Sequence, residues 1–211
     1  MRTRNVCLGV LAAIVVNVAA AAGAAENWLQ FKFDSEHSGN AADRAITTPL
    51  GLVAAIPLTD AIFTAPVVAD GRIYAVDGSG VAFCIDATTL KALWKRETQG
   101  GGINSNNVCS PAIAGKYLHF GTTAGRYYVL DCASGNVVKE IACGEPILST
   151  PVVGSDRVYF ATLGSQVYSL RFDGTVCWVW DYVKERLKFS GDRWSGQQWL
   201  EHKKGRATWR D

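Results

Sequence analysis

The stretch Thr64 to Arg96, TAPVVADGRIYAVDGSGVAFCIDATTLKALWKR, decides the fold because it predicts one complete four-stranded antiparallel unit. The pair Asp70-Gly71 is typical of a two-residue hairpin turn, in which both central residues take a positive φ. The run Asp77-Gly78-Ser79-Gly80 predicts a second turn, and polar residues separate the last two strands. The expected strands are Thr64–Ala69, Arg72–Val76, Val81–Asp86 and Lys91–Arg96.

The unit recurs twice when Pro66, Pro111 and Pro151 are placed in register. Each proline begins an apolar run, where a strand tolerates its missing N–H. Matches follow at fixed offsets after the prolines: at eight residues Tyr74, His119 and Tyr159, at fourteen Gly80, Gly125 and Ser165, at seventeen Phe83, Tyr128 and Tyr168, and at nineteen Ile85, Leu130 and Leu170. The prolines are 45 and 40 residues apart, which is typical of four-stranded propeller blades.

The sequence therefore predicts an all-β protein: an incomplete β-propeller of about three four-stranded antiparallel blades, with a short helix in the C-terminal tail. We expect a signal peptide over residues 1–25, a leader and partial blade over 26–63, three repeats over 64–181, and a charged, tryptophan-rich tail over 182–211. The repeats divide at about 64–108, 109–148 and 149–181.

Two segments outside the repeats carry structural predictions of their own. In the leader, the apolar runs Leu52–Ile56 and Ala61–Ala65 predict a first, incomplete strand pair. In the tail, a capping pattern at Ser195–Gln198 and the later Gly205 predict the short helix. The tail is interpreted as an insertion between blades whose aromatic residues pack on a blade, in preference to a surface for nucleic acid or glycan.

The N-terminal segment predicts export from the cytoplasm. Arg2 and Arg4 precede an apolar run over Cys7–Val18, and Ala22-Gly23-Ala24 fits a signal-peptide cleavage site. A retained membrane anchor is the alternative, but the apolar run is short for a membrane span. We expect a periplasmic or secreted protein with no membrane span after cleavage. Removing Arg2 and Arg4 from 21 basic residues leaves 19 against 19 acidic ones, so charge gives no support for a nucleic-acid partner.

No residue pattern in the sequence predicts catalysis or metal binding. The three histidines, His37, His119 and His202, lack metal-ligand spacing, and His119 occupies a strand-packing position in the repeat register. The loop from Gly100 to Asn107 is interpreted as a connection in preference to a binding face. Signal cleavage would leave five cysteines, which are expected to be small buried hydrophobic residues, although an oxidising compartment would allow disulfides whose pairing stays open: Cys84, Cys109, Cys132, Cys143 and Cys177.

The segment from Cys84 to Trp94, CIDATTLKALW, resembles the A-x-D-x-x-T-G-K-x-x-W repeat of PQQ-like, or quinoprotein-like, β-propellers. The second copy keeps an Asp and a Gly of this pattern but has Lys139 at the tryptophan position, and the third copy is one residue shorter. The opening Trp28-x-x-Phe31 is similar to the leader of such proteins. The structural repeat positions are Pro66, Asp86, Trp94, Pro111, Asp131, Gly135, Pro151, Gly174 and Trp178.

The resemblance implies that the tryptophan packs between blades while the Asp and Gly shape the turn into the last strand. For the dehydrogenases of this family it also implies PQQ and Ca²⁺ near the propeller axis, and in many of them a disulfide between adjacent cysteines. This chain has no adjacent cysteine pair and no recognisable set of metal-ligating carboxylates, so no cofactor is predicted.

These features favour an exported, non-catalytic propeller scaffold for contacts with proteins or envelope polymers, as in the outer-membrane assembly lipoproteins of the family. The alternative is part of a PQQ-dependent quinoprotein oxidoreductase that uses PQQ and Ca²⁺. Because propellers close with about four to eight blades, we expect a fragment of a longer propeller. Its partners would be other proteins or the missing blades, with self-association into a ring as a further alternative.

Overall fold

The chain forms three four-stranded antiparallel sheets, which we call blades 1, 2 and 3 in chain order. The structure is a computed structural model that describes residues 27–42, 44–100 and 106–188. Blade 1 comprises β1 (Val67–Ala69), β2 (Arg72–Val76), β3 (Ala82–Asp86) and β4 (Ala92–Arg96). Blade 2 comprises β5 (Ala112–Ala114), β6 (Tyr117–Gly121), β7 (Arg126–Asp131) and β8 (Val137–Ala142). Blade 3 comprises β9 (Val152–Val153), β10 (Val158–Ala161), β11 (Gln166–Leu170) and β12 (Val176–Asp181).

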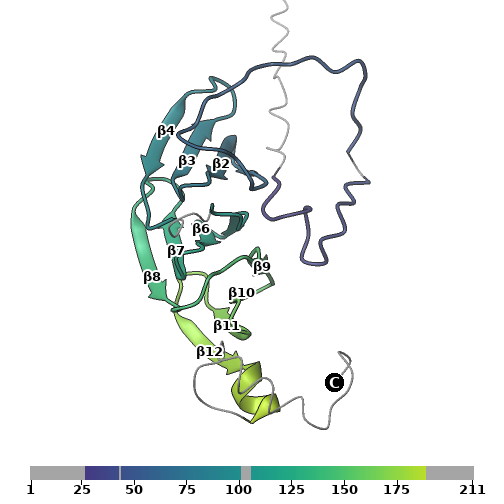
Figure 1. Ribbon diagram of the computed structural model, residues 1–211. Coiled ribbons are helices and arrows are strands. Elements are labelled where there is room, and N and C mark those ends of the chain that lie inside the picture. The colour runs from purple at the N-terminus through teal and green to yellow at the C-terminus, as the bar shows by residue number, and fades with distance from the viewer. Residues whose placement is uncertain (1–26, 43, 101–105, 189–211) are drawn as a thin grey trace, which may run out of the picture.

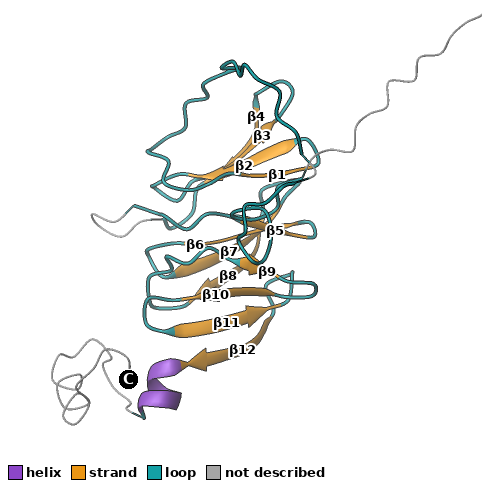
Figure 2. Cartoon of the chain, turned by 90° about the vertical axis from the view of Figure 1, so that its right-hand side faces the viewer, coloured by secondary structure: helices purple, strands orange, loops and turns teal. Residues whose placement is uncertain are grey.

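The blades lie side by side along an arc. Figure 1 shows the fourth strands β4, β8 and β12 along its convex side, whereas the N-terminal leader lies on the concave side. Figure 2 shows the three sheets as successive layers. The first strands of neighbouring blades contact one another, so β1, β5 and β9 are the inner strands of the arc. The predicted architecture, an incomplete propeller of about three four-stranded antiparallel blades, is confirmed.

Blade 1 follows its sequence prediction closely. Ala69 pairs with Arg72 across the predicted two-residue turn, and Asp70 and Gly71 have φ values of 50° and 71°. The second predicted turn is closed by a hydrogen bond from the Gly80 amide to the Asp77 carbonyl. The strands agree with their predicted bounds within one residue, except that β1 begins three residues later than expected.

The hydrophobic core lies between the blades. One cluster joins Tyr74 and Cys84 of blade 1 to Leu118 and Tyr128 of blade 2. A second cluster joins blades 2 and 3 through stacked rings, with the centroids of Tyr127 and Phe160 3.9 Å apart. Blades 1 and 2 bury apolar side chains on both faces, so their strands read as apolar runs instead of a strict polar and apolar alternation. The buried apolar side chains of blade 3 lie on the face toward blade 2.

The leader forms a strap across the inner strands, which the sequence did not reveal. Trp28 exchanges two backbone hydrogen bonds with Val68 of blade 1, at 2.8 and 2.9 Å. The Leu29 carbonyl accepts a bond of 2.7 Å from the Ile113 amide of blade 2. The Gln30 side chain bonds to the backbone of Val153 in blade 3, accepting from its amide at 2.9 Å and donating to its carbonyl at 3.4 Å. Three successive residues therefore tie three successive blades together.

The predicted strand pair over Leu52–Ile56 and Ala61–Ala65 is wrong, because the structure contains no strand between residues 45 and 66. Trp28 pairs with Val68 at the inner edge of blade 1, so this segment finds no partner there. Leu52 is 88% exposed, whereas Leu58 packs on Phe83 and its neighbours and the Thr64 hydroxyl donates to the Val76 carbonyl at 2.6 Å.

After β12 the chain enters a π-helix, η1 (Val183–Leu187), that the sequence did not predict. The expected signal peptide, the predicted helix between Ser195 and Gly205, and the tail tryptophans all lie outside the described residues. Among the residues that the structure does describe, no helix has the length and apolar character needed to cross a membrane.

The strap gives the first prediction. Gln30→Ala removes both bonds to Val153 and leaves partly buried backbone groups without a partner, so it should lower the free energy of unfolding by about 1–3 kcal/mol. Leu29→Ala is the matched control, because Leu29 acts through its backbone and its side chain is 37% exposed. Urea unfolding measures both. Equal losses in the two variants would contradict the role of the Gln30 amide.

Candidate functional site

The contact between blades 1 and 2 depends on two aromatic side chains that reach one backbone carbonyl. The Tyr74 hydroxyl donates to the Cys132 carbonyl at 3.3 Å, and the Trp94 indole N–H donates to the same oxygen at 3.0 Å. The two rings lie on neighbouring positions of blade 1 with their centroids 6.0 Å apart. Cys132 belongs to the turn between β7 and β8, so side chains of blade 1 are hydrogen-bonded to a turn of blade 2.

A glycine in that turn makes room for the tryptophan. A Cβ atom added to Gly135 would lie 2.6 Å from the Trp94 ring, and the φ of Gly135 is 70°. The Asp131 carboxylate shapes the turn by accepting from the Ser134 amide at 2.9 Å and from its hydroxyl at 2.8 Å. These two hydrogen bonds hold the pKa of Asp131 below its usual value. Asp86 takes the same position in blade 1, where it accepts from Thr89.

The contact between blades 2 and 3 uses the same positions with different residues. His119, which stands where blade 1 has Tyr74, donates from Nε2 to the Phe172 carbonyl at 2.9 Å. Lys139 stands in place of the tryptophan, and a Cβ atom added to Gly174 would lie 2.8 Å from the Cβ atom of Lys139. The glycine and the turn carbonyl are thus kept, while the aromatic pair is replaced by a histidine and a lysine.

Burial keeps the His119 ring neutral near pH 7. Its side chain is fully buried, and desolvation lowers its pKa to about 4, against a weaker opposing effect of its bond to Phe172 and of the charge on Asp173. The neutral ring donates to a carbonyl through Nε2 and accepts from the Tyr127 hydroxyl, 3.4 Å from Nδ1. His119 is therefore an interblade structural residue, as its register position predicted, and the structure does not bring it together with His37.

Blade 3 repeats the aromatic pair of blade 1 without a following blade in the described part of the chain. The rings of Tyr159 and Trp178 lie 6.2 Å apart, and Trp178 is 45% exposed. The repeat prolines, Pro66, Pro111 and Pro151, each stand one residue before an inner strand. The structure thus places the sequence-selected positions at blade contacts, turns and strand starts, and it does not gather them into one pocket.

Among the residues that the structure describes, two clefts open at the turn ends of the blades. The first, of about 290 Å³, lies between blades 1 and 2 and is lined by residues that include Arg72, Tyr74, Lys116 and Cys132. The second, of about 460 Å³, lies between blades 2 and 3 at the equivalent position in the repeat. It is lined by Tyr117, Asp156, Arg157, Arg171, Phe172 and Asp173. Each cleft is lined by two acidic and two basic side chains, and those of the first cleft are Asp70, Asp131, Arg72 and Lys116.

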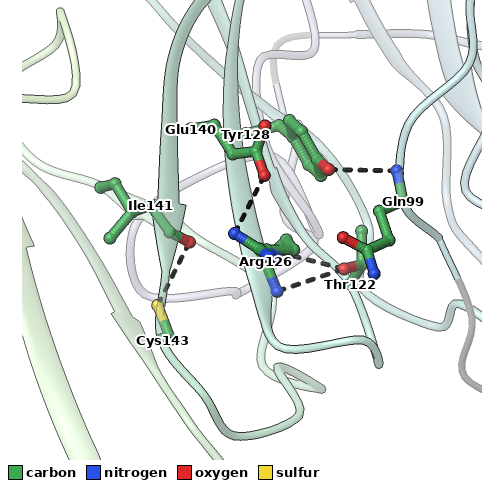
Figure 3. Close-up of polar contacts among 7 residues, drawn as sticks. All are labelled: Gln99, Thr122, Arg126, Tyr128, Glu140, Ile141 and Cys143. Carbon is green, nitrogen blue, oxygen red and sulfur yellow. Dashed lines mark hydrogen bonds and ion pairs between the residues drawn. The ribbon is translucent and has the colours of Figure 1, made fainter.

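The opposite end of blade 2 is closed by a polar network (Figure 3). The Gln99 amide donates to the Tyr128 hydroxyl at 3.0 Å, which ties the segment after β4 to the second blade. Arg126 pairs with Glu140 across β7 and β8 at 3.2 Å, and its amide and carbonyl bond to the Thr122 hydroxyl. The middle of the Gly100–Asn107 loop lies outside the described residues, so its interpretation as a connection stays a prediction.

The described residues do not fit the cofactor and metal of the dehydrogenases. Across 27–42, 44–100 and 106–188, no three His, Cys, Asp or Glu side chains come close enough to hold a metal ion. The inner strands, which would face a propeller axis, are instead crossed by the strap of Trp28 to Gln30. No reaction step through PQQ or Ca²⁺ is therefore derived for these residues.

The sequence did not predict the hydrogen bonds that Cys132, Phe172 and Gln30 form with other blades. The first two contribute backbone carbonyls, and the register does hold a signal for them, because both lie 21 residues after a repeat proline. Gln30 acts through a side-chain amide from outside the repeats, and no periodic signal marks it.

The fold and its repeating blade contacts define the chain as a PQQ-like β-propeller protein. The family model described as "Outer membrane protein assembly factor BamB" matches residues 55–146 and 105–208, and the chain belongs to this family. Comparison with the sequences of curated proteins finds no significant match.

Solved structures show the same fold at low sequence identity. BamB from Moraxella catarrhalis has a TM-score of 0.50 and 18% identity, over 63% of this chain and 38% of that one. Quinohemoprotein alcohol dehydrogenase from Comamonas testosteroni has a TM-score of 0.55 and 19% identity, over 74% and 27%. Quinohemoprotein alcohol dehydrogenase ADHIIG from Pseudomonas putida HK5 has a TM-score of 0.59 and 16% identity, over 84% and 29%. The chain thus spans less than two fifths of each of these structures.

The contact between blades 1 and 2 predicts unequal roles for two tryptophans. Trp94→Ala should lower the free energy of unfolding by about 3–5 kcal/mol, because it empties a packed site and removes a hydrogen bond. Trp178→Ala is the matched control and should cost less than about 1 kcal/mol, because Trp178 is half exposed. Chemical denaturation measures both values. A Trp178 cost as large as that of Trp94 would contradict this assignment.

The contact between blades 2 and 3 predicts acid sensitivity. The pKa of His119 is about 4 in the folded chain and about 6.5 in the unfolded chain, so the unfolded chain binds more protons between these values. The stability contributed by neutral His119 is complete above pH 6.5 and is lost as the pH falls toward 4, by about 3 kcal/mol.

Two variants isolate this effect from the titration of carboxylates. His119→Tyr copies the residue of blade 1, and His119→Gln keeps a neutral donor. Between pH 7 and pH 4, both should lose less unfolding free energy than the parent chain in denaturant titrations. Parallel pH curves for the parent and both variants would show that His119 does not titrate as described.

Proposed function

We propose that the chain is an exported, non-catalytic propeller scaffold that binds other proteins through the outer strand of blade 3. The observation that carries the proposal is the composition and exposure of β12. Four of its apolar residues are exposed by 41–45%: Val176, Trp178, Val179 and Trp180. In the described part of the chain, one edge of β12 pairs with β11 and the other edge has no strand partner.

The three outer strands differ in how their edges are protected. β4 carries Lys95 and Arg96, and β8 carries Lys139 and Glu140, whereas β12 has no charged residue before its final Asp181. Charged residues on edge strands discourage pairing with another chain, and their absence leaves an edge that can accept a further strand. β12 is therefore the outer strand best suited to binding another polypeptide.

The kind of partner follows from the side chains on the two faces of β12. Trp178 and Trp180 are two residues apart and lie on the same face of the sheet. Val179 pairs with Tyr168 on the other face, which is directed toward blade 2. An extended peptide with apolar side chains at alternate positions would add its backbone to the edge and cover the tryptophans. The partner class that we propose is such an extended protein segment.

Family membership and the N-terminal segment support the rest of the proposal. The matching family model is described as an outer membrane protein assembly factor, which is a role in protein assembly. Residues 1–25 have the pattern of a signal peptide, which supports a periplasmic or secreted location. Both features favour binding to other exported or envelope proteins.

The test uses a fluorescent decapeptide of alternating apolar and polar residues, with binding followed by anisotropy. Val179→Lys places a charge on the β12 edge and should weaken binding about tenfold, or about 1.4 kcal/mol. Val138→Lys is the matched control, because Val138 is similarly exposed on β8, and it should leave binding unchanged. Equal binding by the parent chain and Val179→Lys would contradict the proposed surface.

A second titration addresses catalysis. PQQ and Ca²⁺ are added to the full chain, and absorbance is followed. The proposal expects no saturable change at micromolar quinone, whereas saturable binding would contradict the non-catalytic assignment and favour the oxidoreductase.

A further inference from the structure

Cys84 and Cys132 come from different blades and meet at the contact between blades 1 and 2. Cys84 lies on β3 as the cross-strand neighbour of both Tyr74 and Trp94. These two aromatic residues are the ones that donate to the Cys132 carbonyl. Cys84 is fully buried in the core cluster of this contact, and the half-buried Cys132 packs against that cluster.

The Tyr74 side chain connects the two cysteines. Tyr74 is the cross-strand neighbour of Cys84 in blade 1, and its hydroxyl donates to the Cys132 carbonyl of blade 2 at 3.3 Å. Burial raises the pKa of both thiols, to about 12 for Cys132, with an opposing effect of the Arg72 charge. In the folded chain both sulfur atoms therefore stay protonated at neutral pH, which makes thiol exchange slow once the blades have packed.

The other cysteines are placed differently. The Cys109 thiol is held by backbone groups, since it accepts from the Gly121 amide at 3.1 Å and donates to the Ser149 carbonyl at 3.1 Å. The Cys143 thiol donates to the Ile141 carbonyl at 3.8 Å (Figure 3), and Cys177 lies on the outer strand β12. Cys84 and Cys132 are the pair that Tyr74 links across two blades, by strand pairing with the first and a hydrogen bond to the backbone of the second.

We propose that Cys84 and Cys132 form a disulfide that fastens blade 1 to blade 2 when the chain folds in the presence of a disulfide oxidant. The structure shows the pair as free thiols. One thiolate attacks the oxidant disulfide, RSSR, and releases one RSH; the second thiolate then attacks the mixed disulfide and releases the other. The two protein thiols lose two hydrogen atoms, and RSSR is reduced to two RSH. The expected oxidising compartment of an exported chain supplies an oxidant of this class.

The repeat supplies the variants that test the bond with least disturbance. Val129 occupies the position of Cys84 in blade 2, and Ala87 occupies the position of Cys132 in blade 1. Cys84→Val and Cys132→Ala therefore install residues that the fold already accepts at these places. Cys177→Ala is the matched control, because it removes a cysteine away from this contact.

The full chain is unfolded with its thiols reduced and is then refolded in a mixture of reduced and oxidised glutathione. Free thiols are alkylated, and tryptic peptides are analysed by mass spectrometry without reduction. The proposal expects peptides 73–91 and 127–139, each with one cysteine, to be joined, and Cys109, Cys143 and Cys177 to be alkylated. Alkylation of both Cys84 and Cys132, or a bond between Cys109 and Cys143, would overturn it.

Thermal unfolding gives a second readout. The oxidised parent chain should melt roughly 5–10 °C above the reduced chain, because the bond restricts the unfolded state. The difference should persist in Cys177→Ala and vanish in Cys84→Val and Cys132→Ala. If Cys84→Val fails to fold, Cys132→Ala decides alone, since it changes a half-buried turn residue. A shift that survives in Cys132→Ala would overturn the proposal.

Discussion

The structure depends on the contact between neighbouring blades, in which side chains of one blade donate hydrogen bonds to a turn carbonyl of the next. A single four-stranded sheet cannot bury its own apolar faces, so each blade needs a neighbour. The hydrogen bonds from Tyr74 and Trp94 to the Cys132 carbonyl fix that neighbour in position, and Gly135 lets the indole approach the turn closely. Apolar packing alone is not directional, whereas two hydrogen bonds to the same carbonyl fix the position of one sheet relative to the next.

Variation of this contact along the chain links the fold to its proposed use. His119 and Lys139 keep the geometry between blades 2 and 3 with less aromatic area, and Tyr159 and Trp178 present the pair again at the end of the arc. The strap joins all three blades on the inner side, which leaves the outer strands as the surface for partners. The same repeat position therefore packs between blades as Trp94 and is exposed as Trp178.

What could be predicted from the sequence is what repeats in it. The prolines, the turn residues and the tryptophan of the first copy recur at fixed spacings, so three blades and most strand bounds followed from them. The strap could not be predicted, because Gln30 bonds to a residue 123 positions away and has no counterpart in the repeats. The strand predicted over Leu52–Ile56 does not form, although the segment is apolar. A strand also needs a free sheet edge to pair with, and Trp28 occupies the inner edge of blade 1 at Val68.

The clearest test of the interblade contact is native-state hydrogen exchange, measured residue by residue in increasing denaturant. If Tyr74 and Trp94 fasten blade 1 to blade 2, amides in β3 and β7 should converge on one opening free energy. Amides in β11 should exchange from a separate opening of lower free energy, because the aromatic pair is replaced at the contact with blade 3. Opening of β3 that is independent of β7 would contradict the account.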